Sequence, residues 1–292
     1  MSKYIRKKYI RCVTYDTDCV IMIVIQDYKL IDRIGKGMYG EVWQGHHILN
    51  KRNIAIKVER KSSINSLKRE MIILQHLKTL RCIPFVKLFG QTAIYNYIVM
   101  EILGGTIESY CSDILPNTER IDEIKWIGLN MLNCLREIHE NGIIHRDIKP
   151  SNFLLTCDKK NIKLIDFGLA RQFKDNQGRH KPPTQHKHLI GTLRYISTHV
   201  HEGCEPSRRD DVISMTYILL YLWNKSLPWQ SVTDCGKITK TQLVYEFKKI
   251  LVVDELRIDI SSKMDDILEY VYSLAYYDEP DYDYMSFLLN TI

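Results

Sequence analysis

The sequence predicts an α+β protein built as two lobes, a small β-rich N-terminal lobe with one main helix and a larger, mainly helical C-terminal lobe. Two observations favour this class. Residues 28–101 contain short runs rich in β-branched and aromatic residues, which strands prefer, with one helical segment inserted. Beyond residue 101 the apolar residues recur at helical spacing. Gly104-Gly105 lies where the pattern changes, so we place the lobe boundary between residues 103 and 104.

The N-terminal lobe is predicted from local patterns. Ile54–Glu59 and Tyr95–Glu101 are expected to be strands. Between them, Ser66–Leu77 is predicted to be a helix because its apolar residues are three or four positions apart. These residues are Leu67, Met71, Leu74 and Leu77.

Three helices are predicted in the C-terminal lobe. The first ends near Asn141-Gly142, a usual helix stop. Its apolar face consists of Ile124, Ile127, Met131, Leu135 and Ile138. Two further apolar helices are expected at residues 211–223 and 264–275.

Composition limits the classes of function. The chain has 292 residues and a net charge of +6, which favours acidic or phosphorylated partners but is too small to indicate specific nucleic-acid binding. No apolar run approaches the roughly 18–20 residues that span a bilayer. The eight cysteines are scattered without a C-x-x-C pair, as in reduced intracellular proteins. We therefore expect an intracellular monomer, cytoplasmic or nuclear.

Residues 1–27 precede the first lobe. Basic residues come before a short apolar run, Val20–Ile25, but Asp16 and Asp18 interrupt this pattern and the run is too short for a signal peptide. We interpret residues 1–27 as a leader or an extra edge strand.

The first motif with a possible chemical role is the glycine-rich segment G-x-G-x-x-G-x-V. Gly35, Gly37 and Gly40 lack a Cβ, which lets the backbone approach phosphates closely. A dinucleotide-binding fingerprint shares these glycines but should open a helix, and a P-loop needs Gly-Lys-Ser/Thr. Here a strand beginning at Val42 follows. A plain glycine-rich hairpin remains the alternative for this motif alone.

Lys57 and Glu70 form a candidate pair. Lys57 lies in an apolar strand, where its ammonium can reach ATP phosphates if an acid on the inserted helix steadies it. Glu70 follows thirteen residues later, on the predicted helix. Two unrelated surface charges are the alternative for this pair taken in isolation.

The segment H-R-D-I-K-P-S-N, residues 145–152, carries the strongest signal. Asp147 can accept or orient the proton of a substrate hydroxyl, and Lys149 can neutralise the transferring phosphate. Asn152 and the Asp166 of Asp166-Phe167-Gly168 offer oxygen ligands, which suit Mg2+. The four motifs together, in this order, predict phosphoryl transfer from ATP with Mg2+.

The motifs resemble those of the eukaryotic protein kinases and, within them, the casein kinase 1-like group. Three later segments carry the group resemblance: Gly191–Tyr195 (G-T-L-R-Y), Ser207–Asp211 (S-R-R-D-D) and Ser226–Gln230 (S-L-P-W-Q). The resemblance implies a kinase domain at 28–292, with 28–103 as N-lobe and hinge and 104–292 as C-lobe. It also implies transfer of the ATP γ-phosphate to protein serine or threonine. A kinase-fold scaffold without activity is the rival, and the intact motifs argue against it.

The resemblance assigns further roles. Thr192 would bridge Asp147 and Lys149 beside the substrate hydroxyl, and the backbone of Leu103 would bond the adenine. The other adenine-site residues would be Ile34, Val42, Ala55, the gatekeeper Met100 and the hinge residue Glu101.

Substrate preference is predicted from charge. The segment from Arg171 to Arg194 contains one acid, Asp175, and an excess of cations: Arg171, Lys174, Arg179, Lys181, Lys187 and Arg194. Such a surface attracts anions, although a solvated loop without selectivity is the alternative. The resemblance implies anion binding by Arg194 and by a lysine in the region of Lys237 and Lys240. We expect preference for a serine or threonine that follows a phosphorylated or acidic residue, and activity without phosphorylation of Thr184.

Overall fold

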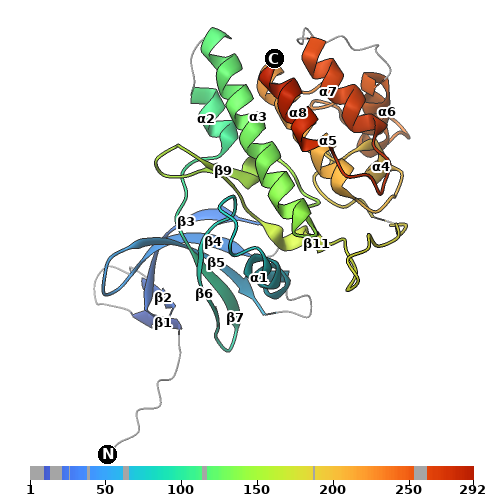
Figure 1. The fold of residues 1–292 in the computed structure, drawn as a ribbon. Helices are drawn as coiled ribbons and strands as arrows, with labels where there is room; N and C mark the ends of the chain where they lie inside the picture. Colours follow the sequence, from blue (N-terminus) through green and yellow to red (C-terminus); the bar gives the residue numbers. More distant parts are fainter. Residues whose placement is uncertain are drawn as a thin grey trace, which may run out of the picture. The chain divides into compact units, whose positions relative to one another are not determined.

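The computed structural model describes residues 10–13, 22–25, 27–37, 40–61, 66–113, 117–186, 188–252 and 262–292. The chain divides into two compact units, Met1–Leu103 and Gly104–Ile292. Figure 1 shows a β-sheet with one helix in the first unit and mostly helices in the second. The predicted α+β class is confirmed.

The first unit is built on a seven-stranded antiparallel sheet in the order β1-β2-β3-β4-β5-β7-β6. Its strands are β1 (Ile10–Val13), β2 (Met22–Ile25), β3 (Tyr28–Lys36), β4 (Glu41–His47), β5 (Asn53–Arg60), β6 (Val86–Gln91) and β7 (Tyr95–Met100). The strands expected at 54–59 and 95–101 are β5 and β7, which are neighbours. Strands β1 and β2 add an edge to the sheet from within residues 1–27, and the rest of that leader, apart from residue 27, lies outside the described residues.

The core of the first unit comes from alternating positions on adjacent strands. Its members are Ile25, Tyr28, Leu30, Ile54, Ile56, Tyr97 and Val99. Helix α1 (Ser66–His76) is the helix that was expected at residues 66–77. Glu59, at the end of β5, accepts the backbone N–H groups of Ser66 and Leu67 at 3.1 and 2.9 Å. These N–H groups have no partner within a helix, so Glu59 fixes where α1 begins.

The second unit contains α2 (Ile107–Asp113), α3 (Asn117–Glu140), α4 (Thr198–His201), α5 (Arg208–Asn224), α6 (Lys240–Val252), α7 (Ser262–Ser273) and α8 (Tyr282–Asn290). The three helices expected from the sequence are α3, α5 and α7. Helix α5 is buried almost all round, as expected for a helix at the centre of a helical unit. It begins earlier than expected because Ser207 and Asp210 form a capping box.

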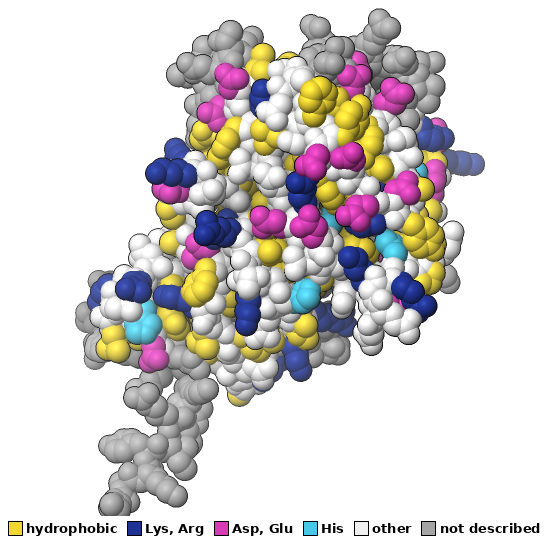
Figure 2. Space-filling view, viewed as in Figure 1, with side chains coloured by type: hydrophobic (Ala, Val, Ile, Leu, Met, Phe, Trp, Pro, Cys, Tyr) yellow, Lys and Arg dark blue, Asp and Glu magenta, His cyan; other side chains and the backbone are white. Residues whose placement is uncertain are grey.

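Four short strands frame the loops of the second unit. They are β8 (Ile143–Ile144), β9 (Phe153–Leu155), β10 (Ile162–Leu164) and β11 (Arg171–Gln172), paired as β9–β10 and β8–β11. The face seen in Figure 2 has acidic and basic side chains interspersed over the second unit. None of the helices in the described ranges combines the length and apolar character that crossing a bilayer requires.

Candidate active site

The glycine-rich motif forms the hairpin between β3 and β4. Gly35 pairs with Val42, and Gly37 N–H donates to the carbonyl of Gly40 at 2.8 Å. A Cβ on Gly40 would lie 2.3 Å from the carbonyl oxygen of Val58, so only glycine fits there. Gly35 and Gly37 have room for a Cβ, so packing within this unit does not require glycine at either position. The two positions between Gly37 and Gly40 lie outside the described residues.

The ammonium of Lys57 lies 2.7 Å from the carboxylate of Glu70. Lys57 is in β5 and Glu70 is in α1, and their side chains are 19% and 4% exposed. The pair is therefore largely shielded from water, where an ion pair is screened less than at the surface. The alternative of two unrelated surface charges is wrong.

Strand register brings several of the predicted nucleotide residues together. Val42 is opposite Lys57, and Ala55 is opposite Met100. Because residues opposite each other, and residues two apart on one strand, share a face, these four side chains lie on the same face of the sheet. Ile34 is the extra residue of a bulge in β3 and is 50% exposed.

The predicted hinge residues follow β7. The backbone N–H of Glu101 donates to the carbonyl of Phe85, and its carboxylate accepts the N–H of Phe85 at 2.6 Å. Glu101 thus anchors the chain that leaves the sheet. Leu103 is the last residue of the first unit.

In the second unit, Asp147 is the centre of a polar cluster. Its two carboxylate oxygens are bonded to different partners, Lys149 Nζ at 2.6 Å and Thr192 Oγ1 at 2.7 Å. Lys149 lies on the same loop, whereas Thr192 comes from 45 residues further along the chain. Asp147 is 8% exposed, so both contacts lie at a site with little water. The structure therefore brings together the three residues that sequence analysis grouped here.

The two predicted metal ligands lie at one end of the β9–β10 hairpin. Phe153 pairs with Leu164, so the residues just outside this pair, Asn152 and Ile165, are adjacent, and Ile165 N–H donates to the carbonyl of Asn152 at 2.9 Å. Asp166 comes next, in the left-handed backbone region with φ of 64°. The side-chain amide of Asn152 donates to the carbonyl of Asp147, which turns its oxygen the other way. An amide oxygen and a carboxylate are donors that fit Mg2+.

Asp211, on α5, holds the start of the segment at residues 145–152. Its carboxylate accepts the backbone N–H groups of His145 and Arg146 at 2.7 and 2.9 Å, and it also contacts His139. Burial alone would raise the pKa of Asp211, but the hydrogen bonds from His139 and from the backbone N–H of His145 lower it. An ionised carboxylate in this position orients the two residues that precede Asp147.

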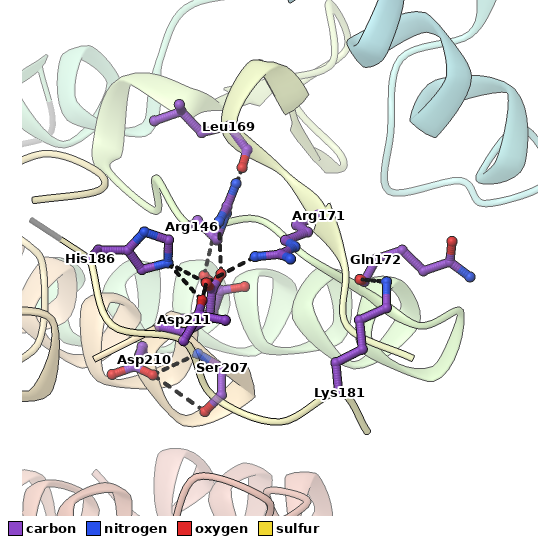
Figure 3. Close-up of polar contacts among 11 residues, drawn as sticks. Arg146, Leu169, Arg171, Gln172, Lys181, His186, Ser207, Asp210 and Asp211 are labelled. Carbon is purple, nitrogen blue, oxygen red and sulfur yellow. Dashed lines mark hydrogen bonds and ion pairs between the residues drawn. The ribbon is translucent and has the colours of Figure 1, made fainter. Parts of the chain in front are cut away.

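Glu205 gathers four side chains from separate segments. Arg146 and Arg171 each donate to its carboxylate at 2.9 Å, Thr184 donates at 2.6 Å, and His186 also contacts it. Figure 3 shows Arg146, Arg171 and His186 converging. Burial would raise the pKa of Glu205, but these hydrogen bonds and the arginine charges lower it to about 2.

A cavity of about 380 Å³ lies beside the Asp147 cluster, within the second unit. Lys149, Thr192, Arg194 and Lys240 are among the residues that line it. Two predicted anion-binding residues, Arg194 and Lys240, therefore share one cavity with Lys149 and Thr192. Lys237 is not among the residues that line it.

The other cations of the segment from residue 171 to residue 194 have different positions. Lys187 lies outside the described residues. Arg171 bonds Glu205, Arg179 bonds Asp175, and Lys181 donates to the carbonyl of Gln172. Part of the predicted positive charge is thus used within the chain.

The sequence analysis did not predict the contacts that Asp211 and Glu205 make. Both belong to the charge-rich segment 205–211, which ends in the first turn of the buried helix α5. Charged residues at the entrance of a buried helix must themselves be paired, and that signal was present in the sequence.

The chain was compared with known proteins. Residues 28–278 match the family described as "Protein kinase domain". The chain is 34% identical over 275 residues to "Casein kinase I homolog 3" of Schizosaccharomyces pombe, an alignment that covers 91% of this chain and 62% of that relative. The protein belongs to the protein kinase family.

Proposed function

We propose that this chain is an ATP- and Mg2+-dependent protein serine/threonine kinase. The observation that carries the proposal is the Asp147 carboxylate, held between Lys149 Nζ at 2.6 Å and Thr192 Oγ1 at 2.7 Å. In this arrangement Asp147 orients the substrate hydroxyl and accepts its proton, while Lys149 neutralises charge on the transferring phosphate. Thr192 keeps the carboxylate in one orientation.

Nucleotide and metal would be held by the residues that the kinase motifs supply. Asn152 and Asp166 would hold Mg2+, which neutralises phosphate charge when bound. Lys57, steadied by Glu70, would contact the α- and β-phosphates. Gly35, Gly37 and Gly40 would let the backbone approach the phosphates. The adenine would contact Ile34, Val42, Ala55, Met100, Glu101 and Leu103.

We further propose that the substrates are proteins with an acidic or phosphorylated residue upstream of the acceptor. Arg194 and Lys240 line the same cavity as Lys149 and Thr192, so an anion bound there would lie close to the acceptor hydroxyl. Arginine forms strong charge-assisted bonds with phosphate oxygens. The scattered cysteines support action in the cytoplasm or nucleus.

The test is transfer of labelled phosphate from ATP to casein by the purified chain. Asp147→Asn keeps the size of the side chain but removes the proton acceptor, and we expect it to lose at least ~100-fold in turnover. A nucleotide-binding regulator would instead bind ATP without labelling any protein, and that result would reject the proposal.

A further inference from the structure

Two buried side chains, Lys248 and Trp229, bond the segment Leu193–Ile196, and Trp229 also lines the cavity. The ammonium of Lys248 donates to the carbonyls of Leu193 and Ile196 at 2.8 and 2.7 Å. The indole N–H of Trp229 donates to the carbonyl of Arg194 at 2.8 Å. Lys248 and Trp229 are 0% and 1% exposed. Three carbonyls in four residues are therefore bonded to buried side-chain donors.

This segment and the residue before it form part of the wall of the cavity. Arg194 lines it, and Thr192, immediately before the segment, bonds Asp147. The carbonyl of Thr192 accepts the backbone N–H groups of Tyr195 and Ile196 at 2.8 and 3.1 Å. A shift of the segment would therefore move Thr192 and Arg194 together.

Helix α6 connects the cavity with its support. Lys240, Val244 and Lys248 are four residues apart, so they lie on one face of the helix. Lys240 and Val244 line the cavity, and Lys248, two turns beyond Lys240, reaches the carbonyls behind it. One helix face thus both borders the cavity and supports its wall.

Burying the ammonium group of Lys248 costs desolvation free energy. Its remaining partners in the described part of the chain are His201 Nε2 at 3.3 Å and the rings of Tyr217 and Trp229, with no carboxylate among them. Burial lowers the pKa of Lys248 well below its ordinary value. An apolar side chain would avoid this desolvation cost but would leave two carbonyls without their donor.

We propose that Lys248, together with Trp229, is a positioning residue for the peptide substrate, holding Thr192 and Arg194 in register with Asp147. The inference rests on the proposed kinase activity and assigns a new role within it. Lys248 acts through the segment Leu193–Ile196 and does not itself touch substrate.

The test compares Lys248→Met with Lys249→Met, its neighbour on α6, whose side chain is 44% exposed. For Lys248→Met we expect the KM for a phosphoserine-primed peptide to rise at least ~10-fold while the KM for ATP changes less than ~2-fold, since only peptide-facing groups move. Amide hydrogen exchange at Tyr195 and Ile196 should accelerate, with no change at α3 amides. Lys249→Met should match the wild type in every measurement.

Trp229→Phe keeps one aromatic ring but removes the N–H that donates to the carbonyl of Arg194. This variant tests the proposal if Lys248→Met does not fold. It should change the peptide KM and the exchange at Tyr195 and Ile196 in the same direction. The proposal would be overturned if the folded variants had the wild-type peptide KM and wild-type amide exchange. It would also be overturned if the KM values for peptide and for ATP rose equally and amide exchange became faster throughout the chain. If the wild type transfers no phosphate, the proposed function fails, but the local exchange measurement still decides whether Lys248 holds this segment.

Discussion

Arg146, the residue before Asp147, donates a hydrogen bond of 2.9 Å to the buried carboxylate of Glu205. A phosphorylated loop residue would supply the same kind of anion to this arginine. Burial lowers the pKa of Arg146, and the carboxylate of Glu205 opposes that effect. The chain therefore provides the counter-charge from its own sequence.

The first prediction is activity without activation-loop phosphorylation. Protein made in bacteria should be active, and Thr184→Ala should stay within about 3-fold of it, because it removes one of several bonds to Glu205. Glu205→Ala should lower turnover about 10-fold or more, since the Arg146 side chain loses its carboxylate partner and, within the described ranges, keeps only the carbonyl of Leu169 as a hydrogen-bond acceptor. Steady-state assays before and after phosphatase treatment measure this. Loss of activity on both phosphatase treatment and Thr184→Ala would contradict it.

The second prediction concerns stability in acid. The pKa of Glu205 is lowered from 4.5 to about 2, so its ionised form stabilises the fold above pH 4.5. That contribution is lost as the pH falls from about 4.5 towards 2. The difference in urea midpoint between wild type and Glu205→Gln should therefore shrink across this range. Glu140→Gln, at an exposed position, is the control and should track the wild type throughout.

The third prediction concerns the phosphate and metal contacts. Lys57→Met and Asp166→Asn should each lower turnover at least ~100-fold, as loss of a charged transition-state contact usually does. Lys61→Met, which changes an exposed lysine just after β5, should not. Circular dichroism should show all three variants folded. Near-normal turnover in either of the first two would reject the assigned roles.

The fourth prediction is a preference for primed peptides. A peptide with phosphoserine upstream of the acceptor should be phosphorylated faster than its unprimed twin, and added salt should reduce the difference. Arg194→Ala combined with Lys240→Ala should remove most of the preference. Lys237→Ala should change it little, because Lys237 does not line the cavity. Equal rates for both peptides in the wild type would end this hypothesis.

Local sequence patterns were sufficient to predict the site residues that lie on regular strands and helices. The strand that carries Lys57 was predictable from its β-branched residues, and the helix that carries Glu70 from the spacing of its apolar residues. The two side chains were then expected to pair because the helix directly follows the strand. The cluster of Asp147, Lys149 and Thr192 was predictable only through family resemblance, since Thr192 is 45 residues away from Asp147 in the chain.

Helix α6 was not predicted, and its buried face explains why. Lysine occupies one of the two fully buried positions among the described side chains of this helix, Lys248 beside Val244, where an amphipathic pattern would have an apolar residue. The value of a buried lysine at position 248 depends on carbonyls more than fifty residues away, which no local window contains. The partners of Glu205 are non-local in the same way.

Two contacts connect the end of β5 to α1. Lys57 forms an ion pair with Glu70, and Glu59 accepts hydrogen bonds from the first backbone N–H groups of the helix. Both contacts must break before α1 can swing away from the sheet. If α1 is rarely displaced, an inhibitor that binds only the conformation with α1 displaced finds few molecules in that conformation. Its apparent affinity falls in proportion to the fraction of molecules that adopt it. Compounds that accept α1 in place are therefore the better starting point for a chemical probe of this protein.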